Sequence, residues 1–178
     1  MRVPGANTGK KVALGVVMSR SWPARKRYRA LQRLGLDRLG PAYFSPGVYI
    51  SDLHGLYGPG GCFINTEVFF DNGPFYIGRG VKIAARCVLL SSTHAIGPPS
   101  ARAGDGVFTE TRIEEGCWIG AGATIMPGIT IGEGCVIGAG AVVTHDCEPN
   151  GLYLGVPARR VRDLPTTRDQ SLPGRETE

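Results

Sequence analysis

The stretch I-E-E-G-C-W-I-G-A-G-A-T-I-M-P-G-I-T-I-G-E-G-C-V-I-G-A-G-A-V-V, residues 113–143, decides the fold. A branched aliphatic residue opens each group of six and recurs without a break at Ile113, Ile119, Ile125, Ile131, Ile137 and Val143. An α-helical face would need recurrence near 3.6 residues, and a half-buried strand alternates at two. A period of six is instead typical of a hexapeptide-repeat parallel β-helix, in which three hexads close one triangular coil. The stretch therefore predicts an all-β fold of stacked coils.

Two further positions of the hexad carry a pattern. The fifth residue is small or compact and is expected to face the interior beside the aliphatic first residue: Cys117, Ala123, Ile129, Cys135, Ala141 and Cys147. The fourth residue is glycine in five hexads, which suits a corner that needs a positive φ: Gly116, Gly122, Gly128, Gly134 and Gly140.

The same frame accounts for the cysteines. It extends back through Ile83 and Ile77 and, across a one-residue insertion near Asp71, to Phe70, Ile64 and Gly58. All five cysteines then fall on the fifth position: Cys62, Cys87, Cys117, Cys135 and Cys147. We expect them to be small buried core residues rather than catalytic groups or metal ligands.

Composition narrows the class of protein. The chain has 178 residues, enough for one domain, and a net charge of +5 whose surplus lies at Arg20–Arg38 and Arg159–Arg168. No basic stripe interleaved with aromatic residues is present, which argues against nucleic-acid binding and favours a small phosphate-bearing cofactor. The apolar run Val12–Met18 is too short to span a membrane and no secretory signal precedes it, so we expect no membrane association and a cytoplasmic location.

The ends of the chain differ from the repeat. Residues 1–45 are expected to form an N-terminal helical cap, with a loose start at Met1–Lys10 and an amphipathic helix over Pro23–Leu36. In this helix Tyr28, Leu31 and Leu34 share one face, and the arginines are expected opposite them. Such a helix would cover the open end of the first coil. Residues 165–178 are polar enough to form a flexible tail.

An interruption marks the place where chemistry is expected. Within the β-helix, residues 46–164, the segment 95–112 contains glycines and prolines that cannot continue the strand pattern. It is 18 residues long, a multiple of six, so the frame resumes at Ile113, as it would after a loop extruded from one corner. His94 stands directly before this loop at a sixth, outward position. Its imidazole suits proton transfer near neutral pH, although a histidine at a loop boundary is more often a hydrogen-bonded surface residue.

These motifs resemble a known family. The repeats, the T-H pair at residues 93–94, the 18-residue loop and G-V-P-A-R at 155–159 together resemble the hexapeptide-repeat O-acetyltransferases, close to the galactoside, maltose and nodulation-type enzymes. The resemblance covers Pro46–Leu164. It implies a left-handed β-helix, a homotrimer with sites between neighbouring subunits, acetyl-CoA as acyl donor and no metal.

The resemblance also assigns roles on the acceptor side. His94 would be the general base that deprotonates the acceptor for direct attack on the thioester, without an acyl-enzyme. Asn65 and Ser51, the latter in the P-x-V-Y-x-S segment that starts at Pro46, would bind the acceptor or the developing oxyanion. Asp71 and Asn72 stand where sugar-binding enzymes carry two acids, so a different acceptor is plausible. Either of two acids would orient His94: Asp105 or Glu110.

On the donor side the resemblance implies a groove for acetyl-CoA. The positions that match are Trp118, Ala121, Ala139, Thr144, Pro157, Arg159, Arg160 and Arg162. The small alanines would let the pantetheine arm approach closely, and the arginines would pair with phosphates. His145 replaces a lysine of the family, which would weaken one phosphate contact.

Other functions remain in competition. An N-acetyltransferase of an amino sugar, or a non-catalytic β-helix that binds a sugar or a protein, would share these repeats. A γ-type carbonic anhydrase would need three histidine ligands, and the only histidines, His54, His94 and His145, contain no closely spaced pair. The altered acid pair and the apolar residues Phe69, Phe70 and Phe108 favour an acceptor less polar than a simple sugar, such as a glycosylated or aromatic natural product, a lipid-linked sugar or an antibiotic.

Overall fold

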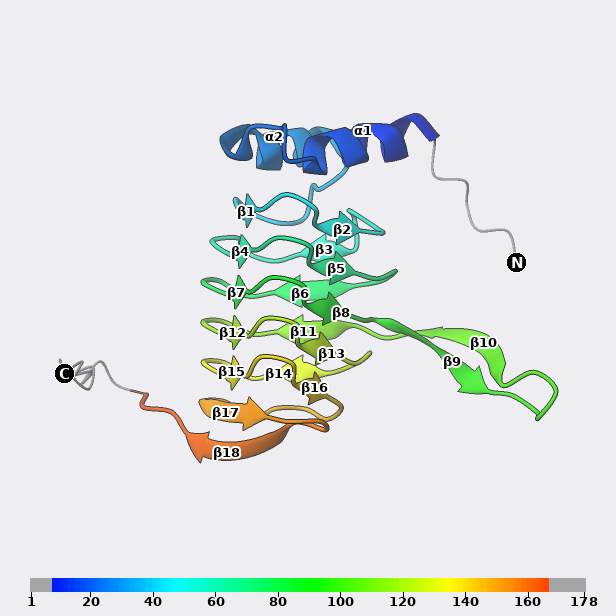
Figure 1. The fold of residues 1–178 in the computed structure, drawn as a ribbon, viewed down its shortest axis with the longest axis vertical. Coiled ribbons are helices and arrows are strands. Elements are labelled where there is room, and N and C mark those ends of the chain that lie inside the picture. Colours follow the sequence, from blue (N-terminus) through cyan, green and yellow to red (C-terminus); the bar gives the residue numbers. More distant parts are fainter. Residues whose placement is uncertain (1–7, 167–178) are drawn as a thin grey trace.

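A stack of β-strand coils with two helices across one end makes up the molecule (Figure 1). A computed structural model describes residues 8–166, so most of the loose start predicted at Met1–Lys10 and of the tail at 165–178 lies outside the described residues. The prediction of a loose start is wrong for residues 8–10, which begin a helix. The helices are α1 (Thr8–Met18) and α2 (Ala24–Leu34). Within the described residues no helix is long and apolar enough to cross a membrane.

The coils are built from three parallel sheets, one for each side of the triangle. The first sheet contains β1 (Tyr43–Phe44), β4 (Phe63–Ile64), β7 (Lys82–Ile83), β12 (Trp118–Ile119), β15 (Val136–Ile137) and β17 (Gly151–Leu154), and β18 (Arg159–Asp163) closes it in antiparallel pairing. The second contains β2 (Tyr49–Ile50), β5 (Phe69–Phe70), β8 (Val88–Leu89), β13 (Thr124–Ile125) and β16 (Val142–Val143). The third contains β3 (Leu56–Tyr57), β6 (Phe75–Ile77), β11 (Thr111–Ile113) and β14 (Thr130–Ile131). The predicted all-β parallel coil is confirmed.

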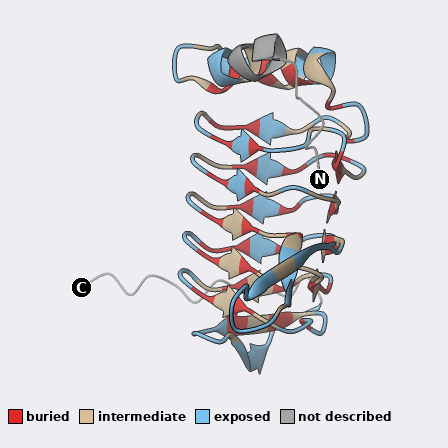
Figure 2. Ribbon diagram, turned by 90° about the vertical axis from the view of Figure 1, so that its right-hand side faces the viewer, coloured by how far each residue is buried: buried red, intermediate tan, exposed pale blue. Residues whose placement is uncertain are grey.

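The predicted core is confirmed in the same register. The aliphatic residues that open the hexads are at most 1% exposed, and Ile113 pairs with Ile77 on one side and Ile131 on the other. The frame therefore passes across the extruded segment as expected. Figure 2 shows buried segments that recur in one coil above the next. The fourth-position glycines all have positive φ, from 67° to 78°.

A second class of glycine was not anticipated. Gly78, Gly120 and Gly132 occupy the second position of their hexads, where a Cβ would come within 2.6–2.7 Å of backbone atoms in the next coil. Real Cβ atoms do not approach so closely, so these glycines permit the stacking distance between coils rather than an unusual φ.

The helical cap is fastened by a buried arginine. Arg27 of α2 is only 1% exposed, and its guanidinium donates hydrogen bonds to the carbonyl oxygens of Phe44 (2.7 Å), Val17 (3.0 Å), Trp22 (2.9 Å) and Ser19 (3.1 Å). The expectation that the arginines of this helix all lie opposite its apolar face is therefore wrong for Arg27. Its five donors satisfy carbonyls at the end of α1, in the following loop and in β1, which no apolar side chain could do.

The extruded segment is a β-hairpin rather than an irregular loop. It consists of β9 (Ser92–Ile96) and β10 (Ala103–Phe108), paired antiparallel with Ser92 opposite Phe108, and it projects away from the coils (Figure 1). We call it the arm. The arm starts before residue 95, so His94 lies inside β9 and not at a corner of the coil.

Candidate active site

His94 is exposed on the arm and is oriented by the opposite strand. Its Nδ1 lies 2.8 Å from the carbonyl oxygen of Gly104. A carbonyl oxygen only accepts hydrogen bonds, so Nδ1 carries the proton and donates it. In the neutral ring Nε2 then keeps its lone pair. The arm thus fixes both the direction and the tautomer of a potential base.

Neither predicted acid touches His94 in the described chain. Glu110 accepts hydrogen bonds from the Tyr57 hydroxyl and from Arg112 (2.5 Å), and these bonds lower the pKa of its carboxyl group. Asp105 is exposed beside Gly104, and its side chain makes no hydrogen bond with another described residue. The backbone carbonyl of Gly104 takes the orienting role that we expected of an acid.

Three of the residues predicted to bind the acceptor, Ser51, Asp71 and Asn72, lie together at the base of the arm. Ser51, Asp71 and Ser92 follow successive strands of the second sheet, β2, β5 and β8. The Ser51 hydroxyl donates to the side-chain oxygen of Asn72, and the Ser92 hydroxyl donates to the Asp71 carboxylate. A chain of contacts thus links Ser51 to β9, two residues before His94.

Asn65 lies at a different corner, between the first and second sheets. Its side-chain oxygen accepts from the backbone N–H of Thr66 (2.7 Å) and from Ser45 (3.4 Å). Asn65 and Trp118 line one hollow of about 690 Å³ on the outer face of the first sheet, together with Phe63, Lys82 and Val136. The structure therefore joins Asn65 to the predicted cofactor wall, and places His94 beyond the far edge of the second sheet of the same chain.

The predicted cofactor residues fall into three places. Trp118 is 54% exposed on β12, and Ala121 and Ala139 are exposed in successive coils at the corner that holds Asn65, with the Gly140 N–H donating to the Ala121 carbonyl (2.9 Å). Thr144 lies instead at the corner after β16, where its hydroxyl contacts Nδ1 of His145 (2.9 Å). Pro157 is exposed in the turn between β17 and β18.

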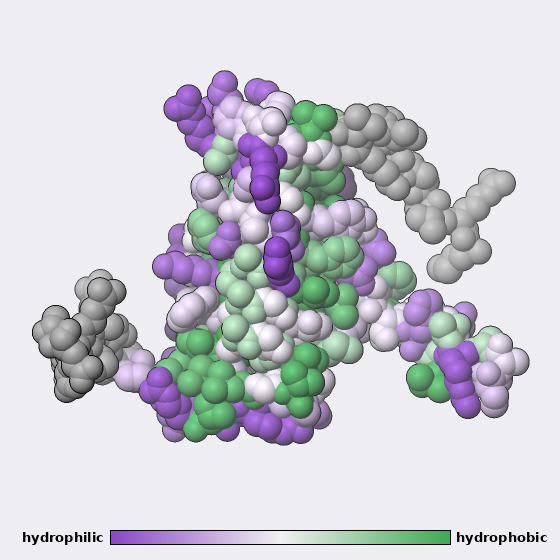
Figure 3. Space-filling view, viewed as in Figure 1, coloured by the Kyte–Doolittle hydropathy of each residue, from purple (hydrophilic) through white to green (hydrophobic). Residues whose placement is uncertain are grey.

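The three arginines of β18 are not equivalent. Arg160 donates to the Tyr153 hydroxyl (3.0 Å), to Asp163 (2.9 Å) and to the carbonyls of Glu148 (2.9 Å) and Pro149 (3.1 Å), so its donors are used within the chain. The side chain of Arg159 donates only to the neighbouring Ala158 carbonyl, and no side-chain hydrogen bond joins Arg162 to a described residue. Beside them, hydrophobic residues gather over β17 and β18 at the foot of the molecule (Figure 3), where Leu154, Val156 and Val161 are exposed.

Known proteins share this architecture. A family model described as "Bacterial transferase hexapeptide (six repeats)" matches residues 110–145. Nodulation protein L of Rhizobium meliloti is 44% identical over 92 residues, 52% of this chain and 50% of that protein. The galactoside O-acetyltransferase of Escherichia coli is 34% identical over 124 residues, 70% of this chain and 59% of that protein. A hexapeptide-repeat acetyltransferase of Vibrio cholerae, solved with acetyl-CoA, aligns with a TM-score of 0.78 at 26% identity, over 88% of this chain and 86% of that one.

The resemblance to the hexapeptide-repeat acetyltransferases is confirmed. The chain has their fold, and most of its curated relatives and the structural neighbour solved with acetyl-CoA are named acetyltransferases. It spans about half the length of the curated relatives that it matches.

Two contacts of this candidate site were not predicted from the sequence. The orienting partner of His94 is a carbonyl oxygen, which every residue supplies, so no side-chain pattern could reveal it. The contacts of Asp71 with Ser92 and of Ser51 with Asn72 join consecutive coils, and each pair is 21 residues apart. A coil length near 20 residues in this part of the chain is the signal that could have found them.

Proposed function

We propose that the chain is a CoA-dependent acyltransferase that moves an acetyl or other short acyl group from acyl-CoA to a hydroxyl of a sugar or sugar-like acceptor. The observation that carries the proposal is the hydrogen bond from His94 Nδ1 to the Gly104 carbonyl, because it leaves Nε2 as a base on an exposed arm. The CoA complexes of structural neighbours with the same fold support the donor.

The transfer follows from this tautomer. Nε2 takes the proton of the acceptor hydroxyl as its oxygen attacks the thioester carbonyl carbon, and a C–O bond forms. The C–S bond then breaks, and the imidazolium returns its proton to the CoA thiolate. The acceptor gains the acyl group, CoA leaves as a thiol, and His94 ends in its starting state.

Direct transfer is favoured by the state of the thiols. All five cysteines are buried and unpaired, and burial raises the pKa of each, to about 11 for Cys62 and about 12 for Cys117 and Cys147. A thiol that stays protonated at neutral pH is a poor nucleophile. No cysteine is therefore suited to carry an acyl-enzyme intermediate.

Asn65 is suited to the developing oxyanion. Its side-chain oxygen is occupied by the Thr66 N–H, so its NH₂ group is the part left to donate. A preorganised donor of this kind stabilises negative charge on the thioester oxygen. The Trp118, Ala121 and Ala139 wall beside Asn65 would hold the pantetheine arm, and Arg159 and Arg162 would meet phosphates.

A complete site needs two copies of the chain. In one chain Asn65 occupies the corner before the second sheet, with Trp118 of β12 lining the same hollow, and the arm with His94 leaves the corner after that sheet. A homotrimer would bring the arm of one subunit to the Asn65 corner of the next. The stacked pairs Tyr43–Phe63 and Tyr49–Phe69 on the outer faces of the first and second sheets supply apolar surface for such packing.

The test is release of CoA from acetyl-CoA by the full chain, measured across sugars, alkyl and aryl glycosides, hydroxylated natural products and amino sugars. We expect release that depends on a hydroxyl acceptor, with the acetyl group found on that acceptor and the protein mass unchanged. Transfer only to amines would make the chain an N-acetyltransferase. Binding of acceptors without turnover would make it a non-catalytic β-helix, and either result would overturn the proposal.

A further inference from the structure

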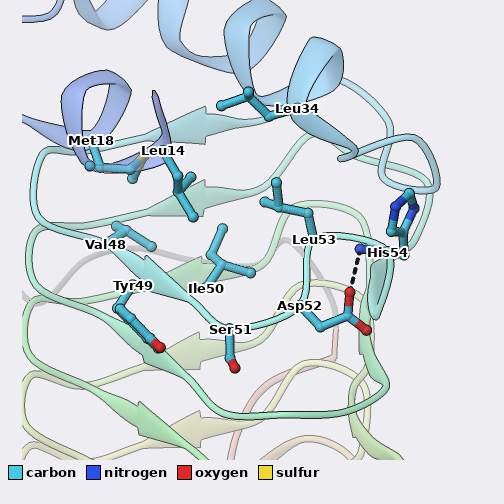
Figure 4. Close-up of a pocket in the computed structure, with 11 residues that line it drawn as sticks. Leu14, Met18, Leu34, Val48, Tyr49, Ile50, Ser51, Asp52, Leu53 and His54 are labelled. Carbon is cyan, nitrogen blue, oxygen red and sulfur yellow. Dashed lines mark hydrogen bonds between the residues drawn. The ribbon is translucent and has the colours of Figure 1, made fainter. Parts of the chain in front are cut away.

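A cavity of about 370 Å³ lies between the helical cap and the first coil. Its walls are apolar: Figure 4 shows Leu14 and Met18 of α1 and Leu34 of α2 above Val48, Ile50 and Leu53 of the first coil. Its volume falls in the range of small-molecule sites, which are mostly apolar with a few polar groups at defined points. None of these six residues belongs to the site described above.

Polar groups lie along one side of this cavity. Tyr49, Ser51, Asp52 and His54 also line it, and Asp52 accepts a hydrogen bond from the His54 backbone N–H at 3.0 Å (Figure 4). Ser51 is shared with the acceptor residues, since its hydroxyl donates to Asn72. The cavity therefore shares Ser51 with the acceptor side of the proposed active site.

The spacing of the coils gives the length of ligand that would reach both places. Ser51 follows β2, and the arm with His94 follows β8, two strands further along the second sheet. Neighbouring strands are about 4.8 Å apart, so the two positions are separated by roughly 10 Å along the stack. An acceptor hydroxyl at His94 and an apolar group in the cavity could belong to one elongated molecule.

We propose that this cavity binds an alkyl or aryl group of the acceptor and selects acceptors that carry such a group about 10 Å from the reacting hydroxyl. This inference rests on the proposed acyltransferase function for its meaning, but the binding itself does not depend on acyl transfer. The polar rim at Ser51 and Asp52 suits the hydroxylated part of the same molecule.

Gly15 of α1 offers a selective way to close the cavity. It lines the cavity, and a Cβ added there would meet no atom within 4 Å. A Gly15→Phe substitution would add a ring at the wall of the cavity, its Cβ would meet no neighbouring atom, and loss of a helical glycine favours the helix. Val16→Phe is the matched control, because Val16 is 52% exposed on the same helix and does not line the cavity.

The experiment is calorimetric titration of the full chain, without acetyl-CoA, with methyl, butyl and heptyl glucosides below their micelle-forming concentrations. We expect affinity to rise about fourfold per added methylene until the cavity is filled, as burial of each CH₂ predicts. Gly15→Phe should abolish this rise, and Val16→Phe should keep it. Equal or undetectable affinities along the series, or a rise that survives in Gly15→Phe, would overturn the inference.

A second measurement separates this inference from the proposed function. With acetyl-CoA present, kcat/KM for acetyl transfer should follow the same order of glucosides, and Gly15→Phe should remove the advantage of the longer chains. Chain-length-dependent binding without any transfer would contradict the acyltransferase and leave the cavity assignment standing. If all glucosides bound equally and were acetylated at equal rates, the acyltransferase would stand and the cavity assignment would be contradicted.

Discussion

At the scale of single residues, a hydrogen bond to the backbone fixes the orientation and the tautomer of His94. Catalytic histidines are often held by carboxylates, and Asp105 and Glu110 were the candidates in the sequence. Glu110 is instead committed to Tyr57 and Arg112 on the third sheet, and the Gly104 carbonyl accepts from His94. A neutral carbonyl selects the tautomer without adding a negative charge, so it orients the base without strongly stabilising the imidazolium.

The buried thiols lead to a prediction about reactivity. Because burial raises the pKa of all five cysteines, the native chain at pH 8 should react with fewer than one equivalent of a thiol reagent such as dithionitrobenzoate. The neutral thiol is favoured in the folded state, so this contribution to stability is present at neutral pH and is lost as pH rises toward 12.

The measurement is the absorbance of released thionitrobenzoate, with the chain in denaturant as the control that exposes all five thiols. Rapid reaction of one or more cysteines in the native chain at pH 8 would show that the hexad core is open. It would also remove the argument against an acyl-enzyme.

At the scale of elements, each coil depends on two kinds of glycine. Gly122 has a φ of 70°, and a Cβ there would meet no atom within 4 Å. At Gly120 the φ is ordinary, but a Cβ would lie 2.6 Å from the backbone nitrogen of Ala139 in the next coil. Gly122 is needed for its positive φ, and Gly120 is needed because a side chain would not fit between the two coils.

Gly122→Ala and Gly120→Ala therefore form a matched pair. Gly122→Ala should lower the free energy of unfolding by about 1 kcal/mol, the cost of an alanine at positive φ. Gly120→Ala should cost more, about 3 kcal/mol or above, because backbone atoms of two coils must separate. Denaturant unfolding of both variants checks the order, and equal or reversed losses would contradict the role given to Gly120.

Much of the fold was predictable because the repeat constrains it. A strict period of six fixes which residues face inward, so the buried cysteines and the resumed register at Ile113 followed from spacing alone. Pairing between the two strands of the arm has no such period, and its glycines and prolines suggested an irregular loop. The burial of Arg27 was not predictable from the helical pattern either, because it depends on four carbonyl partners outside α2.

At the scale of the whole molecule, the residues of the proposed site lie at two different corners of the coil. Asn65 lies before the second sheet and the arm with His94 leaves after it, so we propose that each site combines His94 of one subunit with Asn65 of the next. Sedimentation of the full chain should then give a mass three times the 18.9 kDa of one chain.

Subunit complementation tests this division directly. His94→Ala and Asn65→Ala should each be nearly inactive alone, since loss of an oxyanion donor costs about 10²- to 10³-fold in kcat. Co-expression of the two variants should restore a substantial fraction of wild-type activity, because some interfaces pair an intact His94 with an intact Asn65. Hybrid trimers that stay as inactive as the single variants would place both residues in one subunit.

The central claim is that His94 is the base of a CoA-dependent acyl transfer. The most direct measurement is acceptor-dependent release of CoA by wild-type chain, His94→Ala and Ser100→Ala, the last being an exposed control on the same arm. His94→Ala should lower kcat by about 10²- to 10⁴-fold with little change in KM for acetyl-CoA, and Ser100→Ala should match the wild type. A His94→Ala variant that keeps kcat within threefold of wild type, roughly the 0.6 kcal/mol expected of a bystander, would contradict the account.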